Sequence, residues 1–249
     1  MSLMDEFKAE RESIKQASLK KKLEYFWDYY KWHTIGAFFV LIAIGMFMYT
    51  ASKSTETIFY AIFFNTDLSD SYNEEMSTAF LDYVDIEDEK QTAIIDTGFY
   101  LSADYYESGV QSAHQKLSIF TSTNQLDILG GPMESINVCM YDSYLCDLRT
   151  ILTEEQLEKY EPYFLYSDAA ILEAKQEAAK NSETFKFAYP DPAKPEIMEN
   201  PIPVAIDVSN CEKLQMIYPQ ITEQMAVGIS VGTIQQENAR CFIDYLFEE

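Results

Sequence analysis

The sequence predicts an α/β fold that follows a membrane-spanning helix. Residues 32–52 (WHTIGAFFVLIAIGMFMYTAS) hold no Asp, Glu, Lys or Arg, and β-type and helical patterns alternate from residue 54 onward. A helix of about 21 residues spans roughly 30 Å, the thickness of a bilayer's hydrocarbon core. Alternating strands and helices are typical of a mainly parallel sheet with helices on both faces. The alternative for 32–52 is a buried globular helix, which is rarely so long and so uniformly apolar.

An aromatic belt precedes the apolar run. The segment 25–36 (YFWDYYKWHTIG) holds seven aromatic rings when His33 is counted. Trp and Tyr rings prefer the membrane–water interface, so this belt predicts one edge of the span. The basic residues Lys20–Lys22 and Lys31 lie before the run, and only Lys53 closely follows it. The positive-inside rule therefore predicts a cytoplasmic N-terminus.

The position of the run favours an uncleaved signal anchor over a cleaved signal peptide. Thirty-one residues precede it, which is long for the basic region of a signal peptide, and no small-x-small cleavage site ends it. We therefore expect a cytoplasmic juxtamembrane helix (1–31), a transmembrane signal anchor (32–52) and an extracytoplasmic α/β domain (53–249). The expected location is the cell membrane, with the lipid bilayer as a partner of residues 32–52.

The charge is divided between two parts of the chain. The whole chain has a formal net charge of −23; residues 1–31 hold seven basic and six acidic side chains, which leaves 11 basic and 35 acidic side chains for the rest. The part beyond residue 31 therefore has a net charge of −24. Nucleic acid is excluded as a partner, because its phosphates attract Lys and Arg.

The expected strands and helices follow from local patterns of apolar residues along the chain. Strands are expected at 54–67, 91–101, 126–129, 204–208 and 225–231, and helices at 71–84, 108–123, 135–144, 153–160, 169–180 and 233–247. In the first of these helices, for example, Met76, Phe80 and Val84 share one face. The segment 189–203 holds five of the eight prolines and predicts an extended connection.

Capping boxes mark the start of two of these helices. Ser71 with Glu74 fits the pattern, and so does Thr153 with Gln156. In a capping box the hydroxyl and the carboxyl or amide side chain satisfy backbone N–H groups at the helix start. Both pairs therefore predict helix N-termini at these positions.

Strand-end loops give the candidate ligand site. In open α/β sheets, ligands bind beyond the carboxyl ends of the strands, where helix N-termini present free N–H groups. The expected ligand-binding residues are Asn65, Thr66, Thr97, Tyr100, Gly130 and Gly131. The alternative is a set of ordinary tight turns, because the sequence GGPMES is neither a P-loop nor a dinucleotide-binding fingerprint.

Other chemistry has little support in the sequence. Of the two histidines, His33 belongs to the aromatic belt and His114 lies within an expected helix; no nucleophile–His–Asp order or zinc spacing occurs. The acidic run 85–89 is interpreted as a solvated loop. No catalytic residue, metal or cofactor is expected, although a glycosidase-like pair of carboxylates remains open because sequence spacing does not give distance.

Four cysteines lie beyond the expected span. They are Cys139, Cys146, Cys211 and Cys241. An even number of cysteines outside the cytoplasm permits two disulfides in any of three pairings. Buried free thiols are the alternative, because a chain of this length folds without covalent links.

Two stretches resemble a known class of proteins. Residues 126–166 place Asp127-Ile128 on a strand before Gly130-Gly131, a helix and then Asp147-Leu148, and 225–249 place a strand, a turn and a closing helix in order. This pattern is similar to the type 2 periplasmic-binding class of extracellular solute-binding proteins. The resemblance implies two lobes with a ligand cleft between them. Here it implies one full lobe and a reduced second lobe around 165–205.

These observations together predict a non-enzymatic binding module tethered to the membrane. It would capture a small solute or a peptide outside the cytoplasm for a transporter or a receptor. The alternative is an accessory or scaffold subunit of a membrane complex with a non-functional cleft, and an extracellular hydrolase comes third. A concave site at the strand ends would favour the binding module, and a filled cleft beside an exposed apolar surface would favour the scaffold.

Overall fold

The chain divides into two compact units, Met1–Ser54 and Thr55–Glu249, and each is described by itself. The computed structural model describes residues 18–52, 55–66, 71–88, 90–182, 185–218 and 223–248, and of residues 25, 28, 29, 51, 52, 71, 72 and 216 it describes the backbone alone.

The first unit contains the helix α2 (Leu19–Ser52). Its segment Tyr30–Thr50 is long and apolar enough to cross a membrane, and none of that segment is buried against protein. Among the described residues it is the only helix that meets this test. An apolar helix with no protein contact is consistent with a bilayer as its surroundings. The uncharged run expected at 32–52 lies almost entirely within it.

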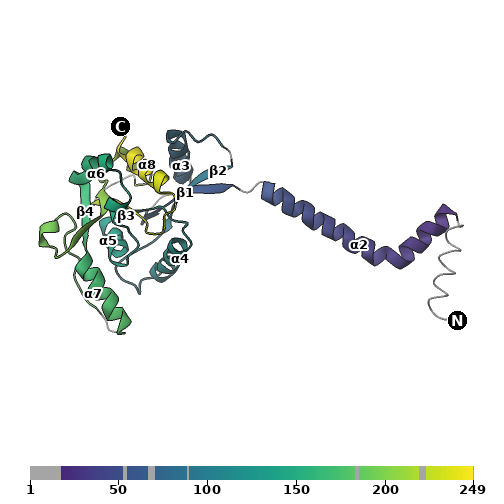
Figure 1. Ribbon diagram of the computed structural model, residues 1–249, viewed down its shortest axis with the longest axis horizontal. Helices are drawn as coiled ribbons and strands as arrows, with labels where there is room; N and C mark the ends of the chain where they lie inside the picture. The colour runs from purple at the N-terminus through teal and green to yellow at the C-terminus, as the bar shows by residue number, and fades with distance from the viewer. Residues whose placement is uncertain are drawn as a thin grey trace. The chain divides into compact units, whose positions relative to one another are not determined.

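The second unit is built on one six-stranded sheet. The strands are β1 (Glu56–Phe64), β2 (Gln91–Phe99), β3 (Ile128–Pro132), β4 (Phe164–Asp168), β5 (Pro201–Asp207) and β6 (Met225–Ile229). Their order across the sheet is β2-β1-β3-β6-β5-β4. Figure 1 shows β2 beside α3 on one side of this unit and β4 on the other.

The sheet is mixed, which corrects the expectation of a mainly parallel one. β1 pairs parallel to β2 and β3, whereas the β3–β6, β6–β5 and β5–β4 pairs are antiparallel. Helices also separate the later strands, since α5 and α6 lie between β3 and β4, and α7 lies between β4 and β5. These strands nevertheless run antiparallel to their neighbours, because a helix between two strands does not by itself determine their relative direction.

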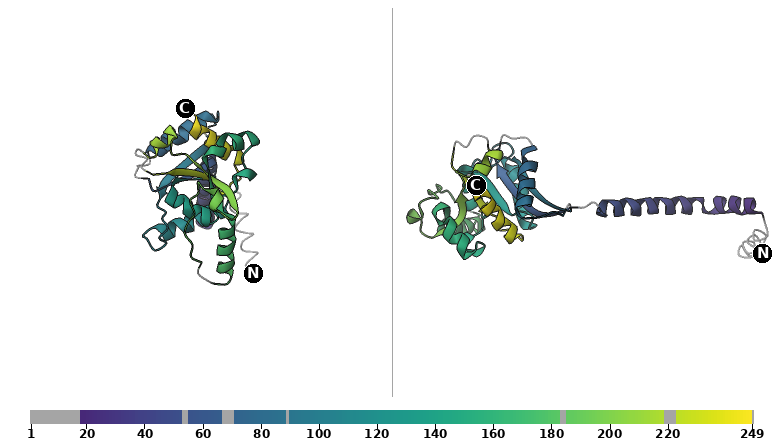
Figure 2. Two further views of the ribbon diagram at one scale, coloured as in Figure 1. Left: turned by 90° about the vertical axis from the view of Figure 1, so that its left-hand side faces the viewer. Right: turned by 90° about the horizontal axis from the view of Figure 1, so that it is seen from above.

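Helices cover both faces of the sheet, as predicted. The helices of the second unit are α3 (Ser71–Tyr83), α4 (Val110–Ser122), α5 (Met133–Tyr141), α6 (Glu154–Tyr160), α7 (Ala169–Lys180) and α8 (Gln236–Phe247), with short 3-10 turns at Leu148–Thr150, Glu161–Tyr163, Pro195–Ile197 and Glu212–Met216. The two views of Figure 2 show helices on either side of the strands.

Alternation along β1 divides the core into two clusters. Phe59 and Phe63 pack on the face that carries α3 and α8, where the Phe59 ring lies 4.7 Å from that of Phe242. Ile62 and Phe64 face the other way, toward α4 and α5. Because β1 is buried on both faces, its near-continuous apolar sequence is the expected one for a central strand.

Sequence signals at the helix starts correctly predicted where α3 and α6 begin. The capping box at α6 is confirmed, since the Gln156 N–H donates to the Thr153 hydroxyl at 3.2 Å and the Gln156 side chain returns to the Thr153 N–H. The side chain of Ser71, which was expected to cap α3, lies outside the described residues. Helix α3 nevertheless begins at Ser71, as predicted.

Two strands differ from the expectation. β3 does not end before the glycines but continues through Gly130 and Gly131 to Pro132, where it pairs with β6. Residue 130 is glycine because the Phe63 ring occupies the space that a Cβ would need. The short strand β4 was not expected at all. Residues around 165–205, expected as a reduced second lobe, instead contribute β4 and β5 to the same sheet.

Candidate functional site

The predicted strand-end residues are only partly brought together. Asn65 follows β1 with a left-handed φ of 56°, a conformation that Asn tolerates better than most residues. Its amide Nδ2 donates to the Leu101 carbonyl and to the Ser135 hydroxyl, both at 2.9 Å, and its Oδ1 accepts from the Leu101 N–H at 2.9 Å. The amide therefore ties the ends of β1 and β2 to the start of α5.

The two threonines are joined to the same region. The Thr66 hydroxyl donates to the Thr97 carbonyl at 3.1 Å. The Thr97 hydroxyl is buried and bonds with the amide of Asn73 on α3 at 2.9 and 3.1 Å. Asn65, Thr66 and Thr97 thus form a network whose hydrogen bonds lie within the chain.

The other three predicted residues, Tyr100, Gly130 and Gly131, do not take part in these side-chain hydrogen bonds. Tyr100 is exposed and donates its hydroxyl to Glu107 at 2.9 Å. Gly130 and Gly131 are buried inside β3, with Gly131 close to Phe64 and its φ at 149°. The glycines therefore present no loop to a ligand. Ligand binding at these strand ends stays a prediction.

The edge of the sheet at β2 offers a different kind of site. β2 is the terminal strand and pairs with β1 alone among the strands that the structure describes. Its first five residues, 91–95 (QTAII), include no charge and no proline. An edge strand presents unpaired N–H and C=O groups, and natural proteins usually protect such edges with Lys, Pro or covering segments. Among the described residues, β2 has no Lys, no Pro and no strand paired on its outer side; it does contain Asp96, and its pairing with β1 has two irregularities.

A hollow lies on each face of the sheet beside β2. The first, here called the α3-side groove, has a volume of about 350 Å³ and is lined by Asn73, Ser77 and Thr78 of α3 and by β2 at Thr92–Ile95. The second, here called the α4-side hollow, has a volume of about 470 Å³. Its lining includes Tyr60, Ile94, Phe120, Asp127 and Ile234. Ile94 contributes to both and is 38% exposed.

One carboxylate of the lining, Asp127, and one beside it, Asp96, give the α4-side hollow its electrostatic character. The Tyr60 hydroxyl donates to Asp96 at 2.9 Å, and burial together with the Asp96 charge raises the pKa of Tyr60 well above its usual value. Asp127 accepts from the Thr233 hydroxyl at 2.6 Å and from the Tyr60 N–H at 2.9 Å. Burial raises the pKa of Asp127, and these hydrogen bonds oppose that shift. Within the described part of the chain, neither carboxylate forms an ion pair with Lys or Arg.

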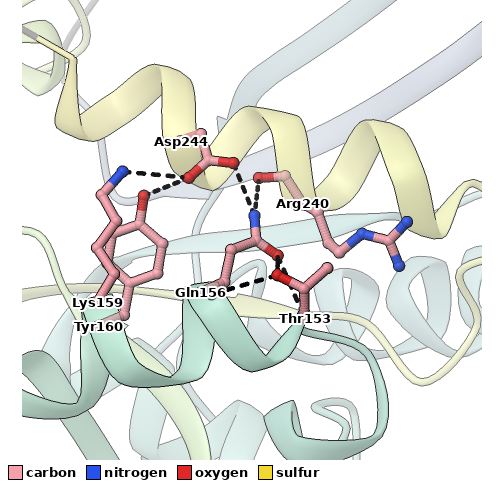
Figure 3. Close-up of polar contacts among 6 residues, drawn as sticks. All are labelled: Thr153, Gln156, Lys159, Tyr160, Arg240 and Asp244. Atoms are coloured by element: carbon pink, nitrogen blue, oxygen red, sulfur yellow. Dashed lines mark hydrogen bonds and ion pairs between the residues drawn. The ribbon is translucent and has the colours of Figure 1, made fainter.

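A second polar cluster has a structural role. Figure 3 shows the Asp244 carboxylate of α8 directed toward α6. It accepts from Gln156 Nε2 at 2.7 Å, from the Tyr160 hydroxyl at 2.6 Å and from Lys159 Nζ at 3.4 Å. Burial, followed by the bond to Asp244, raises the pKa of Tyr160. These bonds fasten α6, which leads into β4, against α8.

The remaining reactive groups are dispersed. All four cysteines are free thiols, and burial raises the pKa of Cys146 to about 12 and that of Cys211 to about 11. His114 lies 3.5 Å from Asp142, which also pairs with Lys175. No three His, Cys, Asp or Glu side chains gather as a metal site among the described residues.

Comparison with known proteins finds no protein-family model and no curated protein that matches the chain. The bare edge and its two hollows are therefore the main guide to function. The sequence did not predict this site, because the residues of a strand do not show whether the strand lies at the edge or in the centre of its sheet. The one available signal was the absence of Lys and Pro from 91–95.

Proposed function

We propose that this chain is a membrane-anchored interaction protein whose folded unit holds an extended segment of a partner protein along β2. The anchor is α2, the N-terminus is cytoplasmic and the second unit lies outside the cytoplasm. The proposal assigns binding and no chemical step. The observation that carries it is the nine-residue edge strand with a hollow beside it on each face.

Strand addition accounts for this combination of features. A partner strand would take the free edge of β2 through backbone hydrogen bonds, about 4.8 Å away from it. Its successive side chains would point to opposite faces of the sheet, and those faces are the ones with the two hollows. In this mode of recognition the backbone supplies affinity, and pockets for alternate side chains supply specificity.

The strand-end network favours this mode over a ligand at the predicted ring. Both polar atoms of the Asn65 side chain bond within the chain, and so does the Thr97 hydroxyl. A ligand there would have to replace these bonds, and a broken buried bond costs about 1–3 kcal/mol. Of the functions expected from the sequence, capture of a peptide by a membrane-tethered binding module is therefore the one we propose.

Site-specific photocrosslinking in intact membranes tests the proposal. A photoreactive side chain would replace Ile94 on β2 or, as a matched control, Ile197, which is 60% exposed on the segment that covers β4. We expect a discrete adduct from position 94 alone, with the crosslink in an extended segment of the partner. Adducts of equal yield from both positions, or from neither, would contradict binding at β2.

A small solute in the α4-side hollow is the second candidate function. The volume of about 470 Å³ lies within the range of about 300–1,000 Å³ that is usual for small-ligand pockets. A thermal-shift screen of the full chain against amino acids, sugars and oxyanions tests it. A ligand present at about 100 times its dissociation constant adds roughly 2.7 kcal/mol of stability, which raises the melting temperature visibly. No shift with any of these compounds would leave peptide capture as the proposal.

The orientation requires its own test. In a background without the four native cysteines, Ser13→Cys lies on the cytoplasmic side of the proposed anchor. We expect it to stay unlabelled by an impermeant thiol reagent in whole cells, whereas Ser108→Cys in the second unit reacts. Labelling of Ser13→Cys would reverse the topology.

A further inference from the structure

We propose, on the basis of the function above, that the segment bound at β2 carries Lys or Arg at alternate positions, and that these side chains enter the α4-side hollow. The partner is thus a basic, extended polypeptide segment of a different protein. Three observations support this: the side-chain alternation of β2, the lining of the hollow and the charge of the folded unit.

The alternation determines which side chains of the partner meet the hollow. Ala93 and Ile95 belong to the core cluster beneath α3, whereas Ile94 lies on the other face with Tyr60. A strand added beside β2 continues the same pleat, so every second side chain lies on the Ile94 face. The remaining side chains lie over the α3-side groove.

The lining of the hollow suits a long side chain with a cationic end. Ile94, Phe120 and Ile234 are apolar, and Ile234 is 67% exposed, which provides contact for an aliphatic stem. Asp127 belongs to the lining but is only 3% exposed. The half-buried Asp96 lies beside the lining, where it accepts from the Tyr60 hydroxyl and the Gly98 N–H, and it supplies the accessible carboxylate. A Lys or Arg buries its stem along apolar surface and keeps its charge at the edge. Each carboxylate oxygen accepts more than one hydrogen bond, so the bond to Tyr60 leaves Asp96 capacity for a cation.

The α3-side groove suits smaller side chains. Its walls include Ser77, Thr78 and Ala93, with Leu81 and the exposed Glu74 also in the lining. The hydroxyl groups and the small methyl group leave contact surface for Thr, Ser or Val. The proposed segment therefore alternates small residues with basic ones.

Charge argues against a second copy of this chain as the occupant. Beyond residue 31 the chain has 35 acidic and 11 basic side chains, so two copies approach with charges of the same sign. An edge-to-edge pair would also place two Asp96 side chains on the same interface with no Lys on either β2 strand. Like charges oppose association, whereas a basic segment is attracted over several ångströms.

The test uses the full chain in nanodiscs of zwitterionic lipid and four fluorescent nonapeptides. Their sequences are TKTKTKTKT, TQTQTQTQT, TETETETET and TKTKPPKTK. Fluorescence anisotropy gives each dissociation constant. We expect the lysine peptide to bind at least about tenfold more tightly than the glutamine peptide, and the glutamate peptide to bind most weakly. The proline peptide has the same charge, and its two adjacent prolines remove an N–H from each side of the strand, so the ladder is broken in either strand direction. We therefore expect it to lose at least about tenfold as well.

A pair of matched variants locates the preference. Asp96→Asn removes the charge of the carboxylate beside the hollow, and Asp191→Asn removes an exposed carboxylate near the other edge of the sheet. We expect Asp96→Asn to reduce the advantage of lysine over glutamine about fivefold and to leave the glutamine peptide unchanged. Asp191→Asn should change neither the advantage of the lysine peptide nor the affinity for the glutamine peptide. An equal loss in both variants would show attraction by overall charge and would overturn the inference.

The peptides also separate the inference from the function on which it rests. If the lysine and glutamine peptides bind equally and the proline peptide does not, strand addition stands and the basic preference is wrong. If the proline peptide binds as tightly as the lysine peptide, strand addition itself is wrong. If no peptide binds, both the function and the inference are overturned.

Discussion

The two edges of the sheet are treated in opposite ways. β2 is nine residues long and pairs with β1 alone among the described strands. β4 is five residues long, and the chain covers its outer side, where the Tyr166 N–H donates to the Pro192 carbonyl at 2.9 Å. The chain thus covers the short edge strand β4 with one of its own segments, whereas no described strand pairs with the outer side of the longer edge strand β2.

The cover over β4 is held by one carboxylate. Asp168 is 6% exposed and accepts from the N–H groups of Ala170, Glu199 and Asn200 at 2.9–3.0 Å. Rings from the same covering segment pack against Tyr141, whose ring lies 5.4 Å from that of Tyr189. Bare edges invite pairing with other chains, so the contrast identifies β2 as the edge that is available to a partner.

The largest expected effect comes from opening the closed edge. Asp168→Ala removes the acceptor of three N–H groups, and hydrogen bonds to a charged group are worth about 1.5–3 kcal/mol each when lost from a partly buried site. We expect the free energy of unfolding to fall by about 3 kcal/mol in a denaturant titration. Asp191→Ala, an exposed residue of the same covering segment, should change it by less than about 1 kcal/mol. A loss below about 1 kcal/mol for Asp168→Ala would mean that the cover does not depend on this carboxylate.

A smaller loss is expected where the chain enters β4. Asp244→Ala leaves the buried Tyr160 hydroxyl without its acceptor and the Gln156 amide with only its longer bond to the Arg240 carbonyl, so we expect a loss of about 2 kcal/mol by the same titration. The exposed Glu158 on the same helix α6 gives the control, Glu158→Ala, which should stay within about 0.5 kcal/mol. A double-mutant cycle of Asp244→Ala with Tyr160→Phe should show coupling, and strict additivity would contradict the contact.

The contrast between the sheet edges β2 and β4 could be predicted only in part from the sequence. Local signals were reliable: the Thr153–Gln156 box starts α6, and the stripe that includes Met76 and Phe80 faces the core. They are reliable because the residues that interact lie only a few positions apart in the sequence. β4 escaped detection because it is short and follows directly on a 3-10 turn at Glu161–Tyr163. Its role as an edge depends on partners about 25–40 residues away.

The candidate site was less predictable than the fold. Gly130 and Gly131 looked like a turn, since glycine is the usual turn residue. Their actual role depends on the Phe63 ring and on Phe64, which lie on another strand. Asn65 was correctly placed at a strand end, but its bonds to Leu101 and Ser135 are a property of the folded chain. Packing across the sheet thus decides which polar groups remain free for a ligand.

Buried tyrosines with raised pKa values should lower the free energy of unfolding in alkali, and Tyr218 is one of them. Tyr218 is buried and donates to the Phe64 carbonyl, and burial raises its pKa above the ordinary value of about 10. Above pH 10 the unfolded chain loses this proton while the folded chain keeps it, so stability falls as pH rises, by about 1.4 kcal/mol per unit for one such group.

Tyr218→Phe isolates that contribution. We expect the slope of unfolding free energy against pH between 10 and 11 to become less negative by about one proton. Tyr163→Phe, at an exposed ring, should leave the slope unchanged. Equal slopes for the wild type and Tyr218→Phe would show that this phenol ionises alike in both states.

The smallest effect is expected at the open edge itself. Ile94→Thr keeps a β-branched side chain on a strand position that is 38% exposed, so we expect the free energy of unfolding to fall by only about 0.5 kcal/mol. The same change at Ile206, fully buried on β5 beside the closed edge, should cost about 2 kcal/mol or more, because it buries a hydroxyl in an apolar core. Denaturant titration of both variants gives the comparison. If Ile94→Thr costs as much as Ile206→Thr, the Ile94 side chain supports the fold itself, and the apolar surface beside β2 is no longer free to serve a partner.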